Sequence, residues 1–385
     1  MDALVGASGT TSNGFIDFYS NKTQLTSDDF EFGKYLGKGA YGQVYLARKK
    51  SGEDAGTIVA MKVISKYKVK HNQWKINNIR GERCILAGIK HPFIIKLFYA
   101  FETNHTFFLG LEYMPNGDLQ RLLCKSVYFN ENTARLYSAE IILALQYLHK
   151  NCIIFRDLKP ENILLDAGGH AKLSDFGFAK QLSSQDDKTT SFCGTANYMA
   201  PEVIKHKLYT RAVDWWSLGV ILFKMITGSR PFDVCDDRQR TMQKIVSGEF
   251  SFDNKRAVLV SPEAQDLIRK LLKLNPAERL GAGETDAREL MDHVFFNNIN
   301  FDDLLACKYE PLTRKRKRTP PFKEIIRTKI RPYHDPRADS HEMIFEDFDY
   351  IAPSWLDPQE DSDVTRLREF YKFVQLLIYA INNFD

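Results

Sequence analysis

The sequence has no apolar run that approaches the roughly 20 residues of a membrane-spanning helix, so we expect no membrane insertion. Its six cysteines are scattered, without a Cys-x-x-Cys pair or a Cys/His cluster at ligand spacing, which argues against a structural zinc site and predicts reduced thiols. The net charge of +4 is small for 385 residues and gives no reason to expect nucleic-acid binding. We therefore expect an intracellular protein, located in the cytoplasm or also in the nucleus.

The two ends of the sequence carry no targeting signal that we recognise. Residues 1–29 are rich in Gly, Ser, Thr and Asn without periodicity, which predicts a mostly disordered leader. The basic run at 314–318, RKRKR, is typical of a nuclear import signal and equally of a solvated linker. The stretch 359–385 has apolar residues at helical spacing. It predicts an amphipathic helix that packs on its own domain or binds a partner or a second copy.

Two regions with different patterns of apolar residues lie between these ends. Residues 30–114 contain short β-like runs, such as FEFGKYLG and IVAMKVI, with one charged, weakly helical segment at 74–89. Residues 115–297 contain long stretches of helical period, such as VDWWSLGVILFKMITG. The pattern predicts an α+β fold of two lobes, a small antiparallel β lobe with one helix and a larger, mostly helical lobe, with a cleft at their junction.

The stretch LGKGAYGQV has the pattern Gly37-x-Gly39-x-x-Gly42-x-Val44 between two predicted strands. Glycines let a backbone approach phosphates closely and direct N–H groups at them. Taken alone, the pattern is more often a plain glycine-rich hairpin. The strand that follows it, where a dinucleotide fold would have a helix, argues against that fold.

Downstream motifs supply charged groups in a fixed order. Lys62, in the apolar run VAMK, would be costly to bury unpaired, and Glu82 on the expected helix is its candidate partner. The alternative is a lysine that reaches solvent from the strand end. The loop IIFRDLKPEN contributes Asp157 and Asn162, and LSDFGFAK contributes Asp175. Phosphoryl transfer needs a carboxylate to orient a hydroxyl, oxygens to hold magnesium, and a cation for the phosphates.

With these motifs, residues 30–297 resemble a eukaryotic protein kinase domain, and the tail at 298–358 extends the resemblance to the AGC group. Within that group, HPFIIKLFYAF and RLGAGETDARELMDHVFF resemble the branch of ribosomal protein kinases and mitogen- and stress-activated kinases. The resemblance implies a serine/threonine kinase that uses ATP and Mg²⁺ on protein substrates. A pseudokinase scaffold and a small-molecule phosphotransferase are the alternatives. The intact charged groups argue against the first, and the segment CGT…MAPE argues against the second.

The resemblance also implies roles for individual residues. Asp157 accepts the proton of the substrate hydroxyl, Lys159 neutralises the transferring phosphate, and Asn162 and Asp175 hold the metal. Glu202 and Arg279 form a buried ion pair, and Asp214 anchors the catalytic loop. The nucleotide site is expected to comprise the glycine-rich loop, the strands beside it, the hinge and the facing edge of the large lobe: Leu36, Gly37, Lys38, Gly39, Ala40, Tyr41, Gly42, Val44, Ala60, Lys62, Glu82, Leu111, Glu112, Met114, Asp118, Glu161 and Leu164.

Two segments match regulatory sites of the family. Ser191 lies at the position of activating phosphorylation by an upstream kinase, where a phosphate could pair with Arg156 and Lys180; Thr190 is the alternative acceptor. The segment 345–350, FEDFDY, resembles the AGC hydrophobic motif, whose Phe345 and Phe348 are expected to dock beside the small-lobe helix. Asp349 stands where many relatives have a phosphorylatable residue. Its charge of about −1, against about −1.5 to −2 for phosphate, predicts constitutive but weaker docking.

Several residues depart from the family pattern. Phe155 replaces a histidine or tyrosine and is expected to pack on Phe176. Gly81 should destabilise the small-lobe helix by about 1 kcal/mol relative to alanine, and we hypothesise that the helix is poorly held until another segment docks on it. Asn78 lies where relatives commonly have a histidine. Lys224 replaces a substrate-reading acid, and Asn197 replaces a glutamate, while Asp118 and Glu161 remain. This predicts a preference for arginine three positions before the target, with little gain from arginine two positions before.

Overall fold

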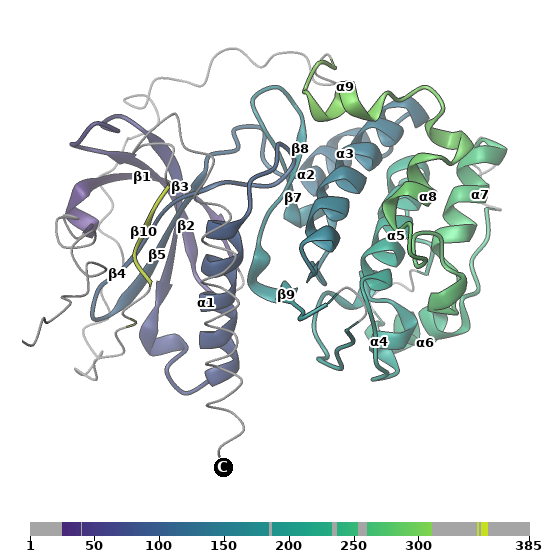
Figure 1. The fold of residues 1–385 in the computed structure, drawn as a ribbon, viewed down its shortest axis with the longest axis horizontal. Helices are drawn as coiled ribbons and strands as arrows, with labels where there is room; N and C mark the ends of the chain where they lie inside the picture. Colours follow the sequence, from purple (N-terminus) through teal and green to yellow (C-terminus); the bar gives the residue numbers. More distant parts are fainter. Residues whose placement is uncertain are drawn as a thin grey trace, which may run out of the picture.

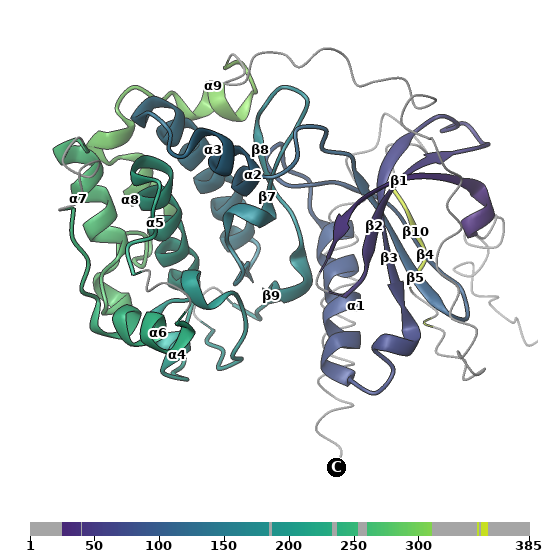
Figure 2. The ribbon, with the colours of Figure 1, turned by 180° about the vertical axis from the view of Figure 1, so that it is seen from behind.

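The chain folds into a small β-rich lobe and a larger helical lobe (Figures 1 and 2). The computed structural model describes residues 25–39, 41–184, 187–232, 237–252, 260–309, 345 and 348–352. Ala40, the basic run 314–318, the stretch 359–385 and most of the expected leader lie outside these residues. The predicted α+β fold of two lobes is confirmed.

The small lobe is an antiparallel sheet with one long helix beside it. The strand order is β1-β2-β3-β5-β4-β10. The strands are β1 (Phe30–Lys38), β2 (Gln43–Lys49), β3 (Ile58–Ser65), β4 (Leu97–Glu102), β5 (Thr106–Glu112) and β10 (Tyr350–Ile351). The short helices η1 (Ser27–Asp29) and η2 (Lys66–Lys68) precede β1 and follow β3. Residues 25–29 of the expected leader are among the described residues; they include η1, and Asp29 pairs with Lys49 of β2 at 3.5 Å.

Helix α1 (Gln73–Gly88) fulfils the prediction of a helix over 74–89. It begins after Asn72, whose side chain accepts a hydrogen bond from the N–H of Lys75, a common N-terminal cap. One face of the helix is buried toward the sheet, through Ile76, Ile79, Glu82, Ile85 and Leu86. Gly81 lies within the helix, and the backbone continues through it without a break.

The large lobe is built around two long helices, α3 (Glu131–Lys150) and α5 (Ala212–Thr227). Both are buried over most of their length, as expected for helices that are apolar on nearly every side. The other helices are α2 (Leu119–Ser126), α4 (Pro201–Ile204), α6 (Arg238–Ser247), α7 (Pro262–Leu271), α8 (Ala287–Met291) and α9 (Phe301–Leu305). Among the described residues, none of the helices combines the length and hydropathy that a bilayer crossing requires.

Short elements line the side of the large lobe that faces the small lobe. They are β6 (Ile153–Ile154), η3 (Pro160–Asn162), β7 (Ile163–Leu165), β8 (Ala171–Leu173), η4 (Phe176–Phe178) and β9 (Lys180–Gln181). The short helix η5 (Ala196–Tyr198) packs against α5 and α6. Farther away lie η7 (Pro276–Glu278) and η8 (Val294–Phe296). Helix α9 packs on α3, and its Leu304 is buried. The start of the expected tail therefore packs as part of the large lobe.

Candidate active site

The glycine-rich loop joins β1 and β2 and lies beside Lys62 of β3. Gly39 N–H donates to Gly42 O at 2.9 Å and closes the turn. A Cβ at Gly42 would lie 2.2 Å from the carbonyl oxygen of Val63, so only glycine fits there. A Cβ at Gly39 would lie 3.4 Å from the side chain of Lys62. The loop is therefore an open cradle of backbone over Lys62, which suits a polyphosphate.

Lys62 lies at the centre of a buried group of charges. Its Nζ lies 2.8 Å from both carboxylate oxygens of Glu82 and 2.9 Å from Oδ1 of Asp175. Burial opposes the charged form of Lys62, but the charges of Asp175 and Glu82 outweigh it, so its pKa lies above the usual range. The partner expected from the sequence is present, and Asp175 adds a second.

The catalytic loop brings Asp157, Lys159 and Asn162 together beside the activation segment. Lys159 Nζ donates to Asp157 Oδ2 at 2.7 Å and to Thr195 Oγ1 at 2.8 Å. Thr195 Oγ1 donates to Asp157 Oδ1 at 2.9 Å, and Asn162 Nδ2 donates to Asp157 Oδ2 at 3.0 Å. Burial raises the pKa of Asp157, and Lys159 and Thr195 counter part of this rise. The carboxylate is thus held as an oriented proton acceptor.

Asp175 follows β8 in a left-handed backbone conformation, with φ 58° and ψ 75°. The next residue, Phe176, is fully buried and packs edge-on against Phe155, with ring centroids 5.1 Å apart. The expected aromatic contact is therefore present. This buried ring fixes the backbone that aims Asp175 at Lys62. An unusual conformation of this kind persists only when the surrounding packing determines it.

Asn162 and Asp175 are suited to hold a magnesium ion with a nucleotide. The carbonyl of Asn162 accepts hydrogen bonds from Ser174 N and Ser174 Oγ, so the two metal-ligand candidates lie on adjoining segments. Within the described ranges no cluster of three or more His, Cys, Asp or Glu residues could hold a metal by itself. One carboxylate and one amide oxygen, completed by phosphates and water, is the set that Mg²⁺ commonly takes.

A buried polar network supports the catalytic loop from below. Asp214, at the start of α5, accepts the N–H groups of Phe155 and Arg156 at 3.0 and 2.9 Å. His149 lies between two carboxylates, with Nε2 3.0 Å from Asp214 and Nδ1 3.2 Å from Asp286. Burial lowers the pKa of His149, but the two carboxylates outweigh this and raise it to about 9. The imidazolium therefore ties α3 to α5 and to the loop before α8.

The expected ion pair between Glu202 and Arg279 is also present. Arg279 is fully buried, and its NH1 and NH2 atoms lie 2.7 and 3.0 Å from the carboxylate of Glu202. Arg279 also donates to the carbonyl oxygens of Ala212 and Lys273. The pair connects the end of the activation segment to the start of α5.

The remaining nucleotide-site candidates of the small lobe and the hinge lie on β1, β2 and β3, at the end of β5 and just after it. Leu36, Gly37 and Lys38 lie on β1, Val44 on β2 and Ala60 on β3, with Val44 opposite Lys62 and Ala60 opposite Leu111 in the strand register. Leu111 and Met114 are buried at the hinge. Glu112 pairs with Lys172 at 2.7 Å.

On the large-lobe side, Asp118 caps α2 by accepting the N–H of Arg121 at 2.7 Å, and its carboxylate also pairs with the Arg121 guanidinium at 3.0 Å. Glu161 is exposed on η3, and Leu164 on β7 bridges to Asp118. Both acids thus lie near the catalytic loop, because α2 packs against η3.

Tyr41 and Asn78 form a contact that the sequence did not indicate. Asn78 Nδ2 donates to the hydroxyl of Tyr41 at 3.0 Å. The Tyr41 ring reaches under the glycine-rich loop, where a Cβ at Gly177 would lie 3.3 Å from it. The loop is therefore tied to α1 next to Asp175.

In the activation segment, Ser191 is connected to each of the two expected basic residues through the side chain of one other residue. Lys180 Nζ donates to Thr189 Oγ1 at 3.0 Å, and this hydroxyl lies 3.4 Å from Ser191 Oγ. Arg156 donates to the hydroxyl of Tyr209 at 3.3 Å, and that hydroxyl donates to Ser191 O at 2.7 Å. Sequence reasoning missed Thr189 and Tyr209, which have no distinguishing local pattern.

The tail docks on the small lobe beside α1. The rings of Phe345 and Phe348 lie 5.6 and 4.9 Å from the ring of Phe107. Tyr350 and Ile351 form β10, which pairs with Ala100 and Tyr99 of β4. The sequence predicted the two phenylalanine contacts but not this added strand.

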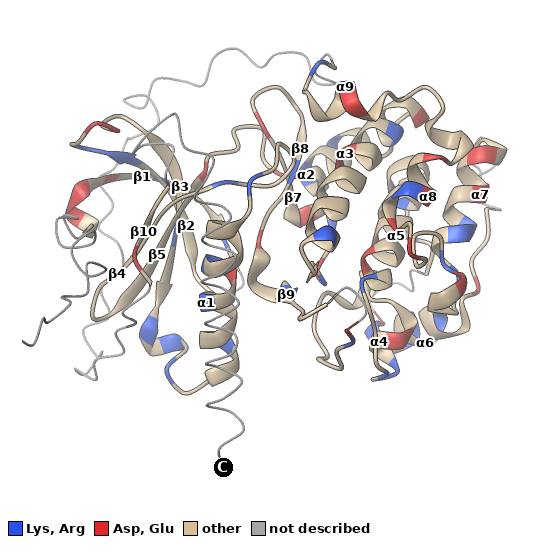
Figure 3. Ribbon diagram, viewed as in Figure 1, with Lys and Arg blue, Asp and Glu red and all other residues tan. Residues whose placement is uncertain are grey.

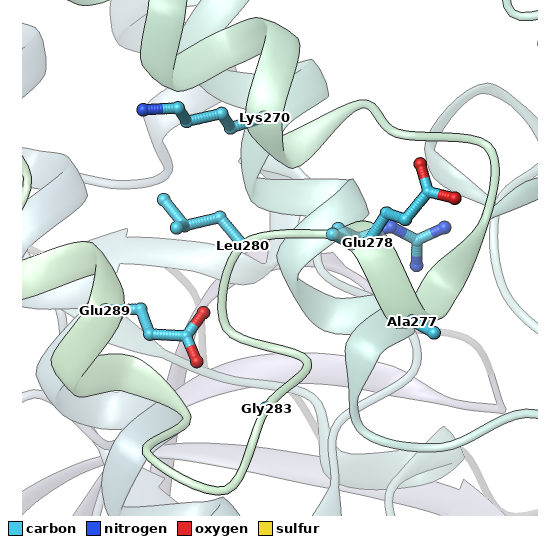
Figure 4. A pocket seen from close by; sticks show the side chains of 7 residues that line it. Lys270, Ala277, Glu278, Leu280, Gly283 and Glu289 are labelled. Atoms are coloured by element: carbon cyan, nitrogen blue, oxygen red, sulfur yellow. The ribbon is translucent and has the colours of Figure 1, made fainter.

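A separate pocket of about 280 Å³ lies in the large lobe between α7 and α8 (Figure 4). Its lining includes Lys270, Glu278 and Glu289. Glu289 is occupied by hydrogen bonds from Gly281 N and Thr285 Oγ1, and Lys270 by an ion pair with Asp266. None of the residues proposed from the sequence for the nucleotide site lines this pocket.

The sequence matches the protein kinase domain family over residues 30–296. Among similar proteins, ribosomal protein S6 kinase beta of Caenorhabditis elegans is 42% identical over 338 residues, covering 86% of this chain and 60% of that protein. Ribosomal protein S6 kinase alpha-6 of Danio rerio is 41% identical over 345 residues, covering 88% and 46%. Ribosomal protein S6 kinase alpha-2 of Mus musculus is 40% identical over 355 residues, with the same coverages. The chain thus spans about half the length of the curated relatives it matches, and these relatives confirm the resemblance drawn from the motifs.

Proposed function

The chain belongs to the protein kinase family, and from this premise we propose that it transfers the terminal phosphoryl group of ATP to serine or threonine of protein substrates. The observation that supports this most strongly is that two groups of charged residues are both assembled, one around Lys62 and one around Asp157. Lys62 contacts both Glu82 and Asp175, while Lys159 and Thr195 hold Asp157 a few residues away from Asn162. A scaffold that only binds would not need all of these groups in place.

Each residue has one task in this proposal. Magnesium-bound ATP supplies the phosphoryl group and the metal charge. Glu82 fixes Lys62 so that its ammonium positions the phosphates, and Asn162 and Asp175 hold the metal. Asp157 orients the substrate hydroxyl and accepts its proton, while Lys159 offsets charge on the transferred group. The Lys159–Thr195 contact supports a serine/threonine substrate, as the family resemblance implies.

We also propose that an upstream kinase activates the protein at Ser191. Arg156 and Lys180 are each linked to this serine through one intervening side chain, as described above. Burial and the charge of Arg156 lower the pKa of Lys180, which indicates an incompletely neutralised basic site. A phosphate there would form charge-assisted hydrogen bonds with both cations and order the segment.

Substrate selection is proposed to follow the charges around α2. Asp118 and Glu161 present acids near the catalytic loop, whereas Lys224 presents an ammonium that donates to Gln120 of α2 and Tyr198 of η5. Lys224 would repel a substrate arginine near these two elements. This supports a requirement for arginine three positions before the target and not two.

The test is phosphate transfer to an arginine-containing peptide, before and after phosphorylation at Ser191, with Asp157→Asn as the inactive control. We expect transfer in the wild type, enhancement after phosphorylation, and loss of at least about a hundredfold in the variant. ATP binding by the variant should persist, because the Asp157 side chain is not a proposed phosphate contact. ATP binding without transfer in both phosphorylation states would instead indicate a scaffold.

A further inference from the structure

The carboxylate of Asp118, the residue that precedes α2, already binds a guanidinium of its own chain. Its Oδ1 accepts the N–H of Arg121 at 2.7 Å, and its Oδ2 lies 3.0 Å from the Nε of the same residue. Both oxygens of the carboxylate are therefore engaged by one arginine. Asp118 is one of the two acids to which the proposed function assigns the recognition of a substrate arginine, so this contact bears directly on substrate selection.

The side chain of Arg121 folds back from α2 over the loop that precedes the helix. A Cβ at Gly117 would lie 3.6 Å from the Cδ of Arg121 and 3.8 Å from its NH1. Gly117 has a φ of +73°, a conformation that suits glycine, so the arginine lies on a stretch of backbone without a side chain. The guanidinium is held on the carboxylate in this way, although 65% of the arginine side chain is exposed.

The pair of Asp118 and Arg121 lies next to the segment proposed to carry out phosphoryl transfer. The backbone of Asp118 bridges to Leu164 of β7. Helix α2 packs against η3, which follows Lys159 and ends at Asn162. This neighbourhood supports the proposal that the upstream residues of a substrate held at Asp157 meet the carboxylate of Asp118.

Individual contacts decide how this region treats an arginine, because acidic and basic residues are interspersed over the helices of the large lobe (Figure 3). On the first turn of α2, Gln120 accepts a hydrogen bond from the Nζ of Lys224 at 2.5 Å. The same turn therefore has two cations of the chain on it, Arg121 in direct contact with Asp118 and Lys224 through Gln120. An approaching substrate guanidinium meets a carboxylate whose charge is already neutralised.

We propose that Arg121 is a specificity-determining residue: its guanidinium occupies the carboxylate of Asp118 and competes there with an arginine three positions before the target. A substrate arginine binds by displacing that of the chain, and this competition lowers the advantage of arginine at that position without abolishing it. The inference rests on the proposed function and deepens it, because it states what limits the recognition of arginine by the same site.

The size of the effect follows from the geometry of the pair. Exposed ion pairs are weak, so displacement of Arg121 costs a substrate arginine about a two- to fivefold loss of affinity and not a hundredfold one. Because Arg121 is three residues from Asp118 in the chain, its local concentration stays the same at any protein concentration. The competition is therefore a fixed property of the site.

The experiment compares two labelled peptides that differ only in arginine or alanine three positions before the serine. Fluorescence anisotropy measures their binding with saturating Mg²⁺ and the non-hydrolysable ATP analogue AMP-PNP. For Arg121→Gln we expect the dissociation constant of the arginine peptide to fall about two- to fivefold, and that of the alanine peptide to stay the same. An unchanged or larger value for the arginine peptide would overturn the proposal. An equal fall for both peptides would overturn it too, because only a general effect of charge explains that result.

Asp118→Asn tests whether Arg121 acts through this carboxylate. Asparagine is an equally good helix cap, so the variant keeps an acceptor for the N–H of Arg121 and loses only the charge. In this background the additional change Arg121→Gln should leave the dissociation constant of the arginine peptide nearly unchanged. A fall as large as in the native background would show that Arg121 acts elsewhere, against the proposal.

Arg288→Gln on α8 is the matched control, because Arg288 is also an exposed arginine in an exposed ion pair, with Asp292 at 3.0 Å. This change should alter neither dissociation constant. Binding is read without phosphoryl transfer, so failure of the proposed function, seen as no transfer from ATP to either peptide, is a separate result. If neither the wild type nor Arg121→Gln binds the arginine peptide more tightly than the alanine peptide, the inference about Arg121 fails whatever the transfer assay shows.

Discussion

Asn78 on α1 donates a hydrogen bond to the hydroxyl of Tyr41 in the glycine-rich loop, at 3.0 Å. The ring of Tyr41 lies against Gly177 and within the electrostatic reach of Lys62, Glu82 and Asp175. The bond therefore holds an aromatic side chain next to the charged groups that we propose bind the nucleotide phosphates.

Removal of this bond is expected to tighten ATP binding. Asn78→Ala and Tyr41→Phe each remove a hydrogen bond worth about 1 kcal/mol, so the dissociation constant for ATP should fall about fivefold if the phosphates must displace Tyr41. Isothermal titration calorimetry measures this. Asn77→Ala, which changes the neighbouring exposed position of α1, is the matched control. Weaker ATP binding in both variants would mean that the bond preorganises the loop for the nucleotide.

Gly81→Ala is expected to stabilise the protein by about 0.5–1 kcal/mol, because alanine favours the helix and loses less conformational entropy on folding. The structure leaves room for it, since a Cβ at Gly81 would have no atom within 4 Å. Urea denaturation measures the free energy of unfolding. Gly219→Ala on α5 should destabilise the protein instead, because its Cβ would lie 2.8 Å from Leu271 Cβ. No gain from Gly81→Ala would contradict the idea that this helix is weak at Gly81.

His149 is expected to make stability depend on pH in the alkaline range. Its pKa rises from 6.5 to about 9 on folding, which corresponds to about 3 kcal/mol of stabilisation. This contribution is complete below about pH 6 and is lost as the pH rises through about 9. The free energy of unfolding of wild type minus that of His149→Gln should therefore shrink between pH 6 and pH 10.

His91→Gln is the control for this pH series. Burial lowers the pKa of His91 to about 4, so it stays neutral over the whole range. Between about pH 8 and pH 10 the imidazole is neutral in the unfolded state too, so the effect of His91→Gln on unfolding should be constant over that part of the series. A constant difference for His149→Gln as well would show that His149 does not titrate between its carboxylates.

Lys224→Glu is expected to change substrate preference. The substitution replaces a repelling ammonium near α2 and η5 by a carboxylate, so arginine two positions before the target should become favourable. We expect kcat/KM for a peptide with that arginine to rise about tenfold relative to one with alanine there. Peptides that differ only at this position give the comparison, with Lys125→Glu on α2 as a charge control. An equal preference in wild type and Lys224→Glu would exclude Lys224 from substrate reading.

Much of the site follows from local patterns. A lysine in an apolar strand needs a buried partner, and Glu82 was the acid available on the one expected helix. Phe155 was expected on the packing side of its loop and lies there against Phe176. Each of these inferences used a short segment and a strong rule about burying charge or aromatic surface.

The missed contacts join residues that no local rule connects. Glu102 and Phe345 are 243 positions apart, and His149 and Asp286 are 137 apart. Glu102, His149 and Asp286 belong to residue types that are common on protein surfaces, and Phe345 was expected to dock through its ring and not through its N–H, so no sequence pattern indicated these hydrogen bonds. Only the packed lobes bring these atoms together, which is why the tail strand, the contact between Glu102 and Phe345 and the histidine network emerged from the structure.

The pairing of β10 with β4 also matters to a chain that has lost its tail. Without β10, the outer main-chain N–H and C=O groups of β4 would be unpaired at the margin of a six-stranded sheet reduced to five. Such an edge is a template for strand pairing with other molecules. Residues 350 and 351 therefore cover this edge of the small lobe. A chain whose tail is released or truncated should self-associate through β4.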